Sequence, residues 1–581
     1  MSCKIQIIKD NRVLELINEK SFIEVWEKLA RQSDKITVIQ ERPFVLTWYS
    51  QYINKYQPVF LLGYNEKGCI VGIIPLAFSI KGKYLVHAGD GQAEYHGWLC
   101  EKEYDDEFPV MAMIEVKKHF NLRKWQWRPM PPRSYIGWFG SEYLRKNRIF
   151  VRKHREDSPV LDLSNEDKIN KIRKNKSIQI KLNRYKKKSG FFIERITSKE
   201  KAKEIFEILA DQCDFRQMAR HESAPFGRDS NKKQFYIERL NFPESNHFTV
   251  LWSDNYPTAF HFGACDHNTV FWGLSSYNPL EERNSPGNIL IIKMIELLKE
   301  EGFSYFDLTP GGAPFKEKFS SFHQEIFTPT FYFVRSDKII ADIKHFVRQS
   351  IKKFVVSIGA KPKAIKESSE KITNVLAEFR GLSPVKIFSK LFTYIYRKET
   401  CHLYKFSIAQ DGHYLKDITE KVDVNKYSDL LLYNDTNPDF KKKGDLFSSA
   451  LKHFGSDDLL YTVVKEGILA QYAWMSKGGK NHSLDLVESE FVSPENSCFL
   501  NDFFTAPNFS GYDLEAKTIS RMLIDSKQKN MQEVFINIPE KDLATRRMVE
   551  SLGFKNVKEF QMIRFLWLTH RRSFSKVNSK D

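Results

Sequence analysis

The sequence predicts a mixed α/β protein made of several units in tandem. Its 581 residues exceed what one hydrophobic core accommodates, because a domain holds about 100–200 residues. With 41% hydrophobic and 28% charged residues, the chain has the balance of a globular protein. Three regions repeat one order of elements: a strand, a turn with proline, an amphipathic helix and a second strand. That order is typical of a β-α-β crossover, so we expect three related α/β units.

The three regions contain the following expected elements. The first has strands at 59–62, 69–78 and 124–127 and a helix at about 109–120. The second has strands at 247–252, 258–264, 269–276 and 305–308, with a helix at about 288–301. The third has strands at 459–465, 469–475, 497–505 and 534–538, with helices at 513–529 and 543–552. We therefore divide the chain into 1–190, 191–336, a connector at 337–400, a third unit at 401–570 and a disordered tail at 571–581.

Two stretches between the regions are strongly basic. A helix is expected at 167–188, with Ser164 as its N-cap, Asp167 at N3 and Gly190 after its end. Its cationic side chains are Lys171, Arg173, Lys174, Lys176, Lys181, Arg184, Lys186, Lys187 and Lys188. This face either is solvated or grips phosphates. The connector is also basic and helical, and it leaves open a contact with a membrane surface through Phe346, Ile351, Val355 and Ile358.

Composition argues against several classes of protein. No stretch approaches the roughly 18 apolar residues that cross a bilayer, and the start MSCKIQIIKD lacks a signal-peptide pattern, so we expect a cytoplasmic protein. The seven cysteines lie far apart without a CxxC pair, which argues against a disulfide framework and a zinc site. The net charge of +17 favours an anionic partner but does not distinguish nucleic acid, a lipid surface and a nucleotide cofactor.

The strongest chemical signal lies at 277–316. A strand ends there, and the next helix is opened by the 285–288 loop, which consists of Ser285, Pro286, Gly287 and Asn288. Proline suits a first helical turn, glycine permits close approach, and uncovered N–H groups at a positive dipole end suit a pyrophosphate. A Ser-Pro-Gly turn is also an ordinary helix start. The following strand places Asp307 and Thr309 at its carboxyl end, beside the helix N-terminus in a right-handed crossover.

These residues resemble a known family. The CelD/BcsL-type acetyltransferases, a branch of the GNAT superfamily, share a run "Y…SPG…L…G…fD…G…yK". This chain resembles that run at Tyr277-Asn278-Pro279, Ser285-Pro286-Gly287, Phe306-Asp307-Leu308-Thr309, Gly312 and Phe315-Lys316. The branch is associated with cellulose and exopolysaccharide biosynthesis and is related to the Fem peptidoglycan transferases. Segments 44–48, 71–76 and 90–95 resemble further family elements, so the resemblance covers roughly 44–333.

The resemblance implies tandem GNAT-like acyltransferase folds and a direct transfer reaction. The halves 1–190 and 191–336 would together form the acetyltransferase domain, with acetyl-CoA or another acyl-CoA at the 285–288 loop, no metal, and the acceptor in a groove between the halves. Direct transfer needs a base and an acid. The candidates are His261 as base, Tyr277 as acid, and Asp307 as base or acceptor anchor. Each has a structural alternative: a core histidine, a packing aromatic and a turn cap.

Three cations are candidates for binding the substrate. Lys316 would bind the acceptor or a phosphate, against the alternative of a surface lysine. Arg216 and Arg220 follow a predicted helix at 201–214, where they would clamp an anion or form ordinary salt bridges.

The third unit resembles a second GNAT domain with an altered donor loop. Ser510 stands where the family's pyrophosphate loop has arginine, and Asp513 stands at its second glycine, so a carboxylate faces the diphosphate position. Val549 stands at the customary tyrosine and has no proton to donate. We expect the GNAT fold here, and structural, acceptor-recognition and catalytic roles stay open.

We therefore expect an acyltransferase that moves an acyl group from acyl-CoA to an amine or hydroxyl, on a small-molecule or glycan acceptor, in envelope or exopolysaccharide biosynthesis. It would act in the cytoplasm, with peripheral association at the inner face of the membrane as an open partner hypothesis. One alternative is a Fem-like transferase that uses aminoacyl-tRNA, and another is a non-catalytic scaffold of polysaccharide assembly. A nucleic-acid partner is not expected, because no reading module is recognisable.

Overall fold

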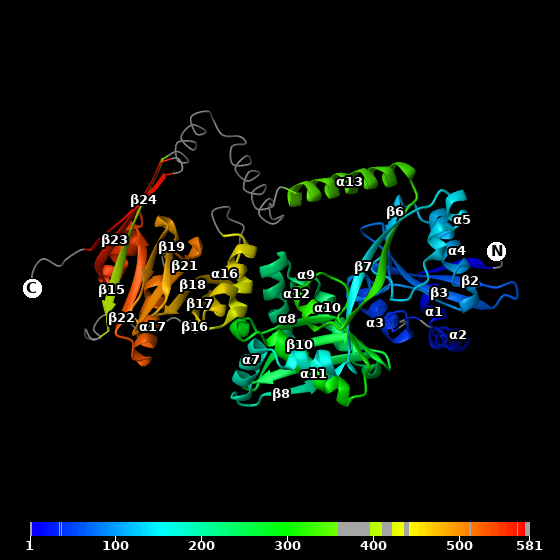
Figure 1. Ribbon diagram of the computed structural model, residues 1–581, viewed down its shortest axis with the longest axis horizontal. Helices are drawn as coiled ribbons and strands as arrows, with labels where there is room; N and C mark the ends of the chain where they lie inside the picture. The colour runs from blue at the N-terminus through cyan, green and yellow to red at the C-terminus, as the bar shows by residue number, and fades with distance from the viewer. Residues whose placement is uncertain are drawn as a thin grey trace, which may run out of the picture. The chain divides into compact units, whose positions relative to one another are not determined.

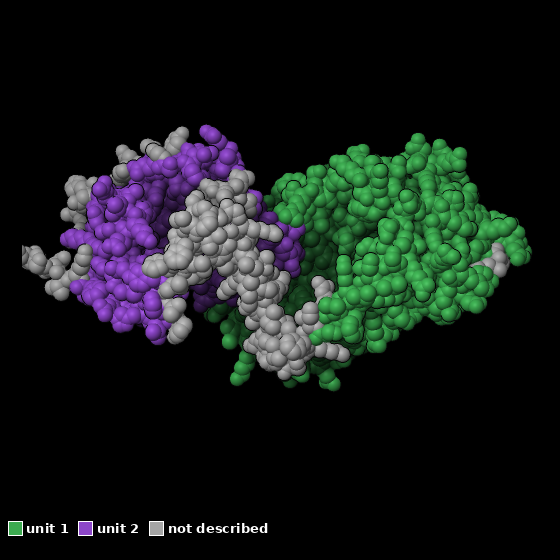
Figure 2. All heavy atoms as spheres, turned by 90° about the horizontal axis from the view of Figure 1, so that it is seen from above, with its two compact units in different colours: residues 1–214, 224–278, 284–352 green, residues 215–223, 279–283, 353–581 purple. Residues whose placement is uncertain are grey.

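The computed structural model describes residues 3–33, 35, 38–357, 396–408, 421–434, 441–510, 513–565 and 568–575. The chain forms two compact units (Figure 2). Unit 1 comprises 1–214, 224–278 and 284–352, and unit 2 comprises 215–223, 279–283 and 353–581. The prediction of a mixed α/β fold with several sheets is confirmed (Figure 1). Within the described residues, every helix is too short or too polar to cross a bilayer.

Unit 1 begins with an antiparallel sheet that is covered on both faces. Its order is β1-β2-β3-β4 with β5 beside β3: β1 Lys4–Lys9, β2 Tyr56–Tyr64, β3 Ile70–Ser79, β4 Leu85–His87 and β5 Leu99–Cys100. Alternate residues of β2 enter two cores, with Phe60 and Leu62 in one and Val59 and Leu61 in the other. The surrounding helices are α1 Asn11–Leu16, α2 Lys20–Arg31, α3 Arg42–Tyr52 and α4 Glu107–His119.

Glycines set how closely α4 approaches this sheet. Gly63 of β2 pairs with Gly72 of β3, and Phe108 of α4 packs on both. A Cβ atom would lie 2.6 Å from the Phe108 ring at Gly63 and 2.8 Å from it at Gly72. The missing side chains therefore make the room that this ring occupies.

A second sheet is built from both predicted halves. Its order is β11-β13-β7-β14-β6: β6 Lys124–Gln126, β7 Phe150–Asp162, β11 Thr269–Phe271, β13 Tyr305–Asp307 and β14 Phe322–Tyr332. The expected crossover of the first region is therefore wrong, because the strand after α4 joins this sheet and not the sheet of β2 and β3. The reason is aromatic burial: Trp125 and Trp127 are buried, and the ring centroids of Trp127 and Phe331 in β14 lie 5.4 Å apart.

The third sheet has the order β12-β10-β9-β8. Its strands are β8 Phe192–Arg195, β9 Asn246–Ser253, β10 Tyr256–Ala264 and β12 Leu274–Tyr277. The predicted single strand at 269–276 is two strands, because β11 pairs with β13 and β12 pairs with β10. Gly273 lies at this change of sheet, where a Cβ atom would come 2.5 Å from the Phe262 carbonyl oxygen. The helices of this region are α8 Lys199–His221, α9 Pro225–Arg228, α10 Ser230–Arg239 and α11 Pro286–Glu300.

The basic stretches also differ from expectation. The helix predicted at 167–188 is two helices, α6 Glu166–Arg173 and α7 Lys176–Lys186. Their N-caps are Asn165 and Asn175, whose side-chain oxygens accept the N–H groups of residues 168 and 178 at 3.0 and 3.2 Å, so Ser164 is not the cap. The connector begins as the predicted helix, α13 Arg335–Ser357 (Figure 1), and its continuation at 358–395 lies outside the described residues. The predicted tail is described up to residue 575 as strand, and the rest lies outside the described part.

Unit 2 contains one large sheet with the order β16-β17-β18-β21-β22-β15-β23-β24. Its strands are β15 Tyr396–Ser407, β16 Asp423–Val424, β17 Leu459–Lys465, β18 Ile468–Lys477, β21 Ser497–Thr505, β22 Glu533–Pro539, β23 Lys555–Phe565 and β24 Leu568–Ser575. Its helices are α16 Lys443–Gly455, α17 Leu514–Gln528 and α18 Leu543–Ser551. The strands β21 and β22 are parallel with α17 between them, which confirms the β-α-β crossover predicted for the third region.

Candidate active site

Two strands of unit 1 diverge at a cluster of polar side chains. The parallel pairing of β11 with β13 ends at Phe271 opposite Asp307. Beyond this point the chain of β11 turns to β12 and pairs with β10, whereas β13 ends. The Trp272 N–H donates to the Asp307 carbonyl at 2.8 Å and closes the last contact between the two strands. Such a separation at the carboxyl ends of parallel strands is a place where ligands bind in α/β proteins.

Asp307 is the centre of this cluster. Its Oδ1 accepts from the Thr309 N–H at 2.7 Å and the Ser158 hydroxyl at 3.1 Å, and its Oδ2 accepts from the Tyr95 hydroxyl at 2.9 Å. The carboxyl group is buried, and burial raises its pKa, although these three donors and Lys316 oppose the rise. The predicted turn-capping role is realised through the Thr309 N–H, and a carboxyl with a raised pKa is also suited to accept a proton.

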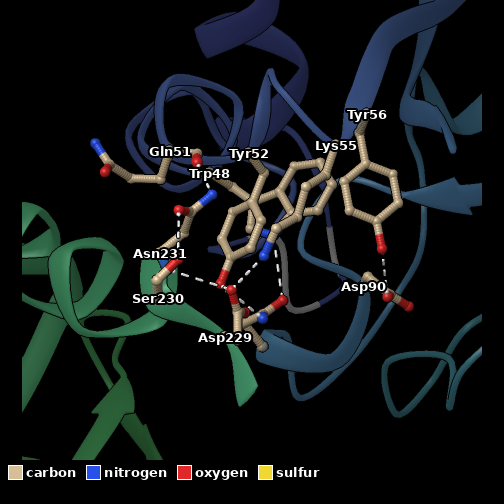
Figure 3. A network of polar contacts seen from close by, with 10 residues as sticks. Trp48, Gln51, Tyr52, Lys55, Tyr56, Asp90, Asp229, Ser230 and Asn231 are labelled. Carbon is tan, nitrogen blue, oxygen red and sulfur yellow. Dashed lines mark hydrogen bonds and ion pairs between the residues drawn. The ribbon is translucent and has the colours of Figure 1, made fainter. Parts of the chain in front are cut away.

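A polar network lies at the start of the 90–95 loop that carries Tyr95 (Figure 3). The Tyr56 hydroxyl donates to Asp90 Oδ2 at 3.2 Å, at the start of the loop. Asp229, which caps α10, accepts from the Tyr52 hydroxyl at 2.7 Å and from Lys55 Nζ at 2.6 Å. The Asp229 contacts join α3 and the residues just after it in the first half to α10 of the second, and the Tyr56 contact attaches the 90–95 loop to β2.

Lys316 lies next to Asp307 but is bound to the chain itself. Its Nζ donates to the carbonyl oxygens of Thr309 and Pro310, both at 2.9 Å. Burial lowers its pKa to about 8, and Asp307 opposes that shift. Thr309 has a φ of 59°, a left-handed conformation that costs free energy and needs such support. Lys316 therefore holds the turn after β13, and its predicted contact with substrate stays a prediction.

The 285–288 loop opens α11 among cations. Ser285 is the N-cap, in a left-handed conformation and without a side-chain capping bond. Pro286 has no N–H, and the Asn288 N–H donates to the Ser285 carbonyl at 3.0 Å, so the Gly287 N–H is the donor left at this helix end. Lys181 Nζ of α7 donates to Ser285 Oγ at 2.5 Å, and Arg184 Nη1 donates to Asn284 Oδ1 at 3.5 Å. The pKa of Lys318, in α12 Pro314–Phe319, is lowered by burial and by nearby Lys181. Positive charge thus surrounds a helix N-terminus, which favours a polyanion.

Tyr277 and Gly287 are in contact at this loop. A Cβ atom at Gly287 would lie 3.3 Å from Tyr277 Cδ1, which is a tight but adjustable distance. The structure therefore brings the predicted acid, Tyr277, to the start of α11.

His261 is buried at the centre of β10. Its Nε2 lies 3.0 Å from the Phe271 carbonyl oxygen, and its ring packs on Trp272 with centroids 5.1 Å apart. Burial, with a smaller effect of His247, lowers its pKa to about 3. An imidazole with such a pKa is a weak base, and this geometry fits the alternative of a core histidine.

Arg216 and Arg220 lie near the end of α8, in residues that belong to unit 2. There the neighbouring Phe215 packs on Phe447 of α16 with ring centroids 4.8 Å apart. The structure thus groups both arginines with unit 2, whereas Asp307, Lys316 and Tyr277 belong to unit 1. The predicted anion clamp stays untested.

Unit 2 has its own strand divergence and a cavity. The pairing of β21 with β22 ends at Leu500 opposite Ile536, and the following residues of both strands line a cavity of about 680 Å³. Glu515 of α17 also lines it, and burial together with Asp542 raises the pKa of Glu515 to about 7. Asp513, the predicted first residue of the helix at 513–529, is the N-cap of α17, and Gly511 and Tyr512 lie outside the described residues.

The comparisons with known proteins match one family model to part of the chain. Residues 172–317 match the family model described as an acetyltransferase (GNAT) domain. The chain therefore contains a GNAT acetyltransferase domain, and the match spans α7, β13, the 285–288 loop, Asp307 and Lys316. The CelD/BcsL type itself is not distinguished by this match. No curated protein matches the chain.

Solved structures also resemble the chain. L-PGS from Bacillus licheniformis is 14% identical over 55% of this chain and 94% of its own, with a TM-score of 0.37. A conserved protein of unknown function from Bacteroides thetaiotaomicron VPI-5482 is 12% identical over 53% and 97%, with a TM-score of 0.35. A tandem GNAT protein from the clavulanic acid biosynthesis pathway is 9% identical over 56% and 98%, with a TM-score of 0.33. At these TM-scores the likenesses carry no argument about function.

Two features of the site were missed by sequence reasoning. Ser158 is 149 residues from Asp307 and lies in a strand without a distinguishing pattern. Tyr95 is 212 residues from Asp307, and its signal was the resemblance of segment 90–95 to a family element. Among the described residues, no group of three His, Cys, Asp or Glu side chains is placed to hold a metal ion.

Proposed function

We propose that unit 1 transfers an acyl group from acyl-CoA to an amine or hydroxyl acceptor at the divergence of β12 and β13. The observation that carries this proposal is the basic N-terminus of α11, linked to the Asp307 cluster through α12. Lys316 of α12 holds the turn after Asp307, while Lys318 of the same helix is close enough to Lys181 to shift in pKa. The short helix α12 therefore lies between the donor anchor and the candidate base.

The donor would place its diphosphate at the 285–288 loop. The Gly287 N–H at the positive dipole end of α11 and the ammonium group of Lys181 would supply hydrogen bonds and positive charge to phosphate oxygens. The thioester would extend from there toward Asp307. This arrangement follows the expectation that the family resemblance gives for the loop.

The chemistry is a direct transfer. The nucleophilic nitrogen or oxygen of the acceptor attacks the thioester carbonyl carbon and its proton passes to the Asp307 carboxylate. The carbon–sulfur bond then breaks, and the leaving thiolate takes a proton from the Tyr277 hydroxyl. The products are the acylated acceptor and free CoA, and the proton on Asp307 returns to Tyr277 through solvent. His261 has no role in this scheme, because it is buried with a low pKa.

The acceptor class and setting belong to the same proposal. The CelD/BcsL-like run includes the loop, Asp307 and Lys316, which supports a glycan or small-molecule acceptor of envelope or exopolysaccharide biosynthesis. Unit 2, whose cavity is lined by the ends of β21 and β22 and by Glu515, would recognise the acceptor. We assign the reaction to the inner side of the membrane on the same grounds.

Calorimetry with acetyl-CoA on the full chain tests the donor site. Lys181→Glu places a carboxylate beside the α11 N-terminus, and we expect the Kd for acetyl-CoA to rise about 10-fold or more. Lys176→Glu makes the same charge change at an exposed position of the same helix, and we expect less than about a 2-fold effect. Equal effects of the two variants would show that only net charge matters, and absence of binding by the unaltered protein would favour the scaffold hypothesis.

A further inference from the structure

The helix α13 presents a stripe of large apolar side chains to solvent. Its members are exposed to 48%, 50%, 57%, 72% and 48%, in the order Ile339, Ile340, Ile343, Phe346 and Val347. Their spacing of one, four, seven and eight residues from the first is that of a single helix face. Single exposed apolar residues are ordinary, whereas five on one face form a continuous patch.

The other side of α13 is attached to unit 1. Arg123 Nη2 lies 2.6 Å from Asp337 Oδ1, and Arg152 Nη1 donates to the Ala341 carbonyl oxygen at 3.0 Å. At 100° per residue, Asp337 and Ala341 lie about 40° apart around the helix, while Ile343 lies about 200° from Ala341. The centre of the apolar stripe, at Ile343, therefore faces away from these contacts, while Ile340 at its edge lies about 60° from Asp337.

The charges of α13 favour an anionic partner. The helix contains six basic residues, Arg335, Lys338, Lys344, Arg348, Lys352 and Lys353, and two acidic ones, Asp337 and Asp342. Both acidic residues are already paired, Asp337 with Arg123 and Asp342 with Lys338. Among the described side chains, Arg335 and Lys344 are exposed and lie about 20° and 40° beyond the two edges of the stripe. This surface is thus apolar along one stripe and cationic beside it, the combination that binds anionic lipid headgroups and the acyl chains below them.

We propose that α13 docks this protein on an anionic lipid surface, lying parallel to the membrane with its apolar stripe in the headgroup region. The helix is not apolar enough to cross a bilayer, so it would rest on it. The sequence prediction of a membrane contact named four positions, of which Phe346 is on the stripe. The side chains of Ile351 and Val355, and residue Ile358, lie outside the described part of the chain. This proposal is independent of acyl transfer, because no residue of the candidate active site is on α13.

Vesicle flotation of the full chain tests the docking helix. We expect binding to vesicles of phosphatidylcholine with about 30% phosphatidylglycerol, weaker binding to phosphatidylcholine alone, and a decrease with added salt. The double variant Ile343→Glu/Phe346→Glu should lower the bound fraction about 10-fold or more, because two carboxylates enter the stripe. Circular dichroism and acetyl-CoA calorimetry should not change, since both side chains are exposed and distant in sequence from the donor loop.

A matched control comes from α7, the other basic helix. Ile180 is 56% exposed there, and Ile180→Glu makes the same chemical change outside α13. We expect this variant to bind vesicles as the unaltered protein does. Loss of binding in Ile180→Glu alone would assign the membrane contact to α7 and overturn the proposal.

Two further results would also overturn it. One is an unaltered protein that stays unbound with anionic vesicles at low salt. The other is a dimer in solution that Phe346→Glu converts to a monomer without any vesicle binding, which would make the stripe a subunit interface.

Discussion

Placing a carboxylate at Gly287 should separate donor binding from folding. Gly287 is the second residue of α11, and its N–H is the one that would meet the CoA diphosphate. Two unit charges about 5 Å apart interact by about 3 kcal/mol at an effective dielectric constant of 20. Since about 1.4 kcal/mol corresponds to a factor of ten, Gly287→Asp should raise the Kd for acetyl-CoA about 100-fold or more.

The steric part of this change needs its own control. Any side chain at Gly287 brings a Cβ atom to 3.3 Å from Tyr277 Cδ1, so the ring must shift by a few tenths of an ångström. Gly287→Asn has nearly the same shape as the aspartate without its charge. Comparison of the two variants by calorimetry isolates the charge effect, which should account for most of the loss.

The stability of the folded chain should increase with the same charge that weakens acetyl-CoA binding. An acidic residue in the first turn stabilises a helix by about 0.3–1 kcal/mol through the helix dipole. Thermal unfolding of Gly287→Asp should therefore occur at a temperature equal to or above that of Gly287→Asn. Equal acetyl-CoA affinities for the two variants would refute the reasoning and move the donor site elsewhere.

Three other predictions concern the cluster and the core. Asp307→Asn should lower the rate of CoA thiol release with a panel of amino-sugar and glycan acceptors about 100-fold or more and leave acetyl-CoA affinity within about 2-fold; an unchanged rate would exclude Asp307 as base. Burial lowers the pKa of Lys316 in the folded chain to about 8, from its ordinary value of 10.5. Between these pH values the unfolded chain binds more protons than the folded one, so the free energy of unfolding should rise with pH there. Lys316→Met should flatten that rise in denaturant titrations at pH 8 and 10, and an identical slope would contradict the lowered pKa. Gly63→Val should lower the free energy of unfolding by about 1–3 kcal/mol, because its Cβ would lie 2.6 Å from the Phe108 ring, and an unaltered denaturation midpoint would show that α4 yields freely.

Local patterns predicted the elements around the 285–288 loop well. The helix expected at about 288–301 is α11 Pro286–Glu300, and the strand expected at 305–308 is β13 Tyr305–Asp307. Proline at the start and glycine after the end define such a helix from neighbouring residues alone. The carboxyl end of β13 therefore lies where the sequence placed it, with Asp307 at its last position.

Pairing between distant strands was not predictable in the same way. A run of alternating residues shows that a strand exists, but its partner depends on which apolar faces meet in space. Residues 269–276 were predicted as one strand because the change of sheet at Gly273 leaves no mark in the sequence: the run stays apolar and has the length of a single strand. The contact of Ser158 with Asp307 was unpredictable for the same reason, because β7 and β13 are neighbours in the sheet but lie far apart in the sequence.

The break between α6 and α7 shows a different limit of prediction from sequence. Asn175 lies among lysines. Its side-chain oxygen accepts the Ile178 N–H and caps α7, so a new helix begins where the prediction had one continuous helix. An asparagine is tolerated inside helices as well as at caps, so the basic pattern outweighed it in the prediction. The shift matters for the site, because α7 as a separate helix carries Lys181 to Ser285.

The mixed origin of the sheet β11-β13-β7-β14-β6 sets an order of events during synthesis. β14, whose last residue is Tyr332, pairs along its whole length with residues 150–160 of β7, and β6 pairs with β14 as well. A ribosome therefore makes more than half of the chain before the partner of β6 emerges. Until then Trp125 and Trp127 lack the strand that buries them, and chaperones that hold apolar nascent chains should engage this stretch.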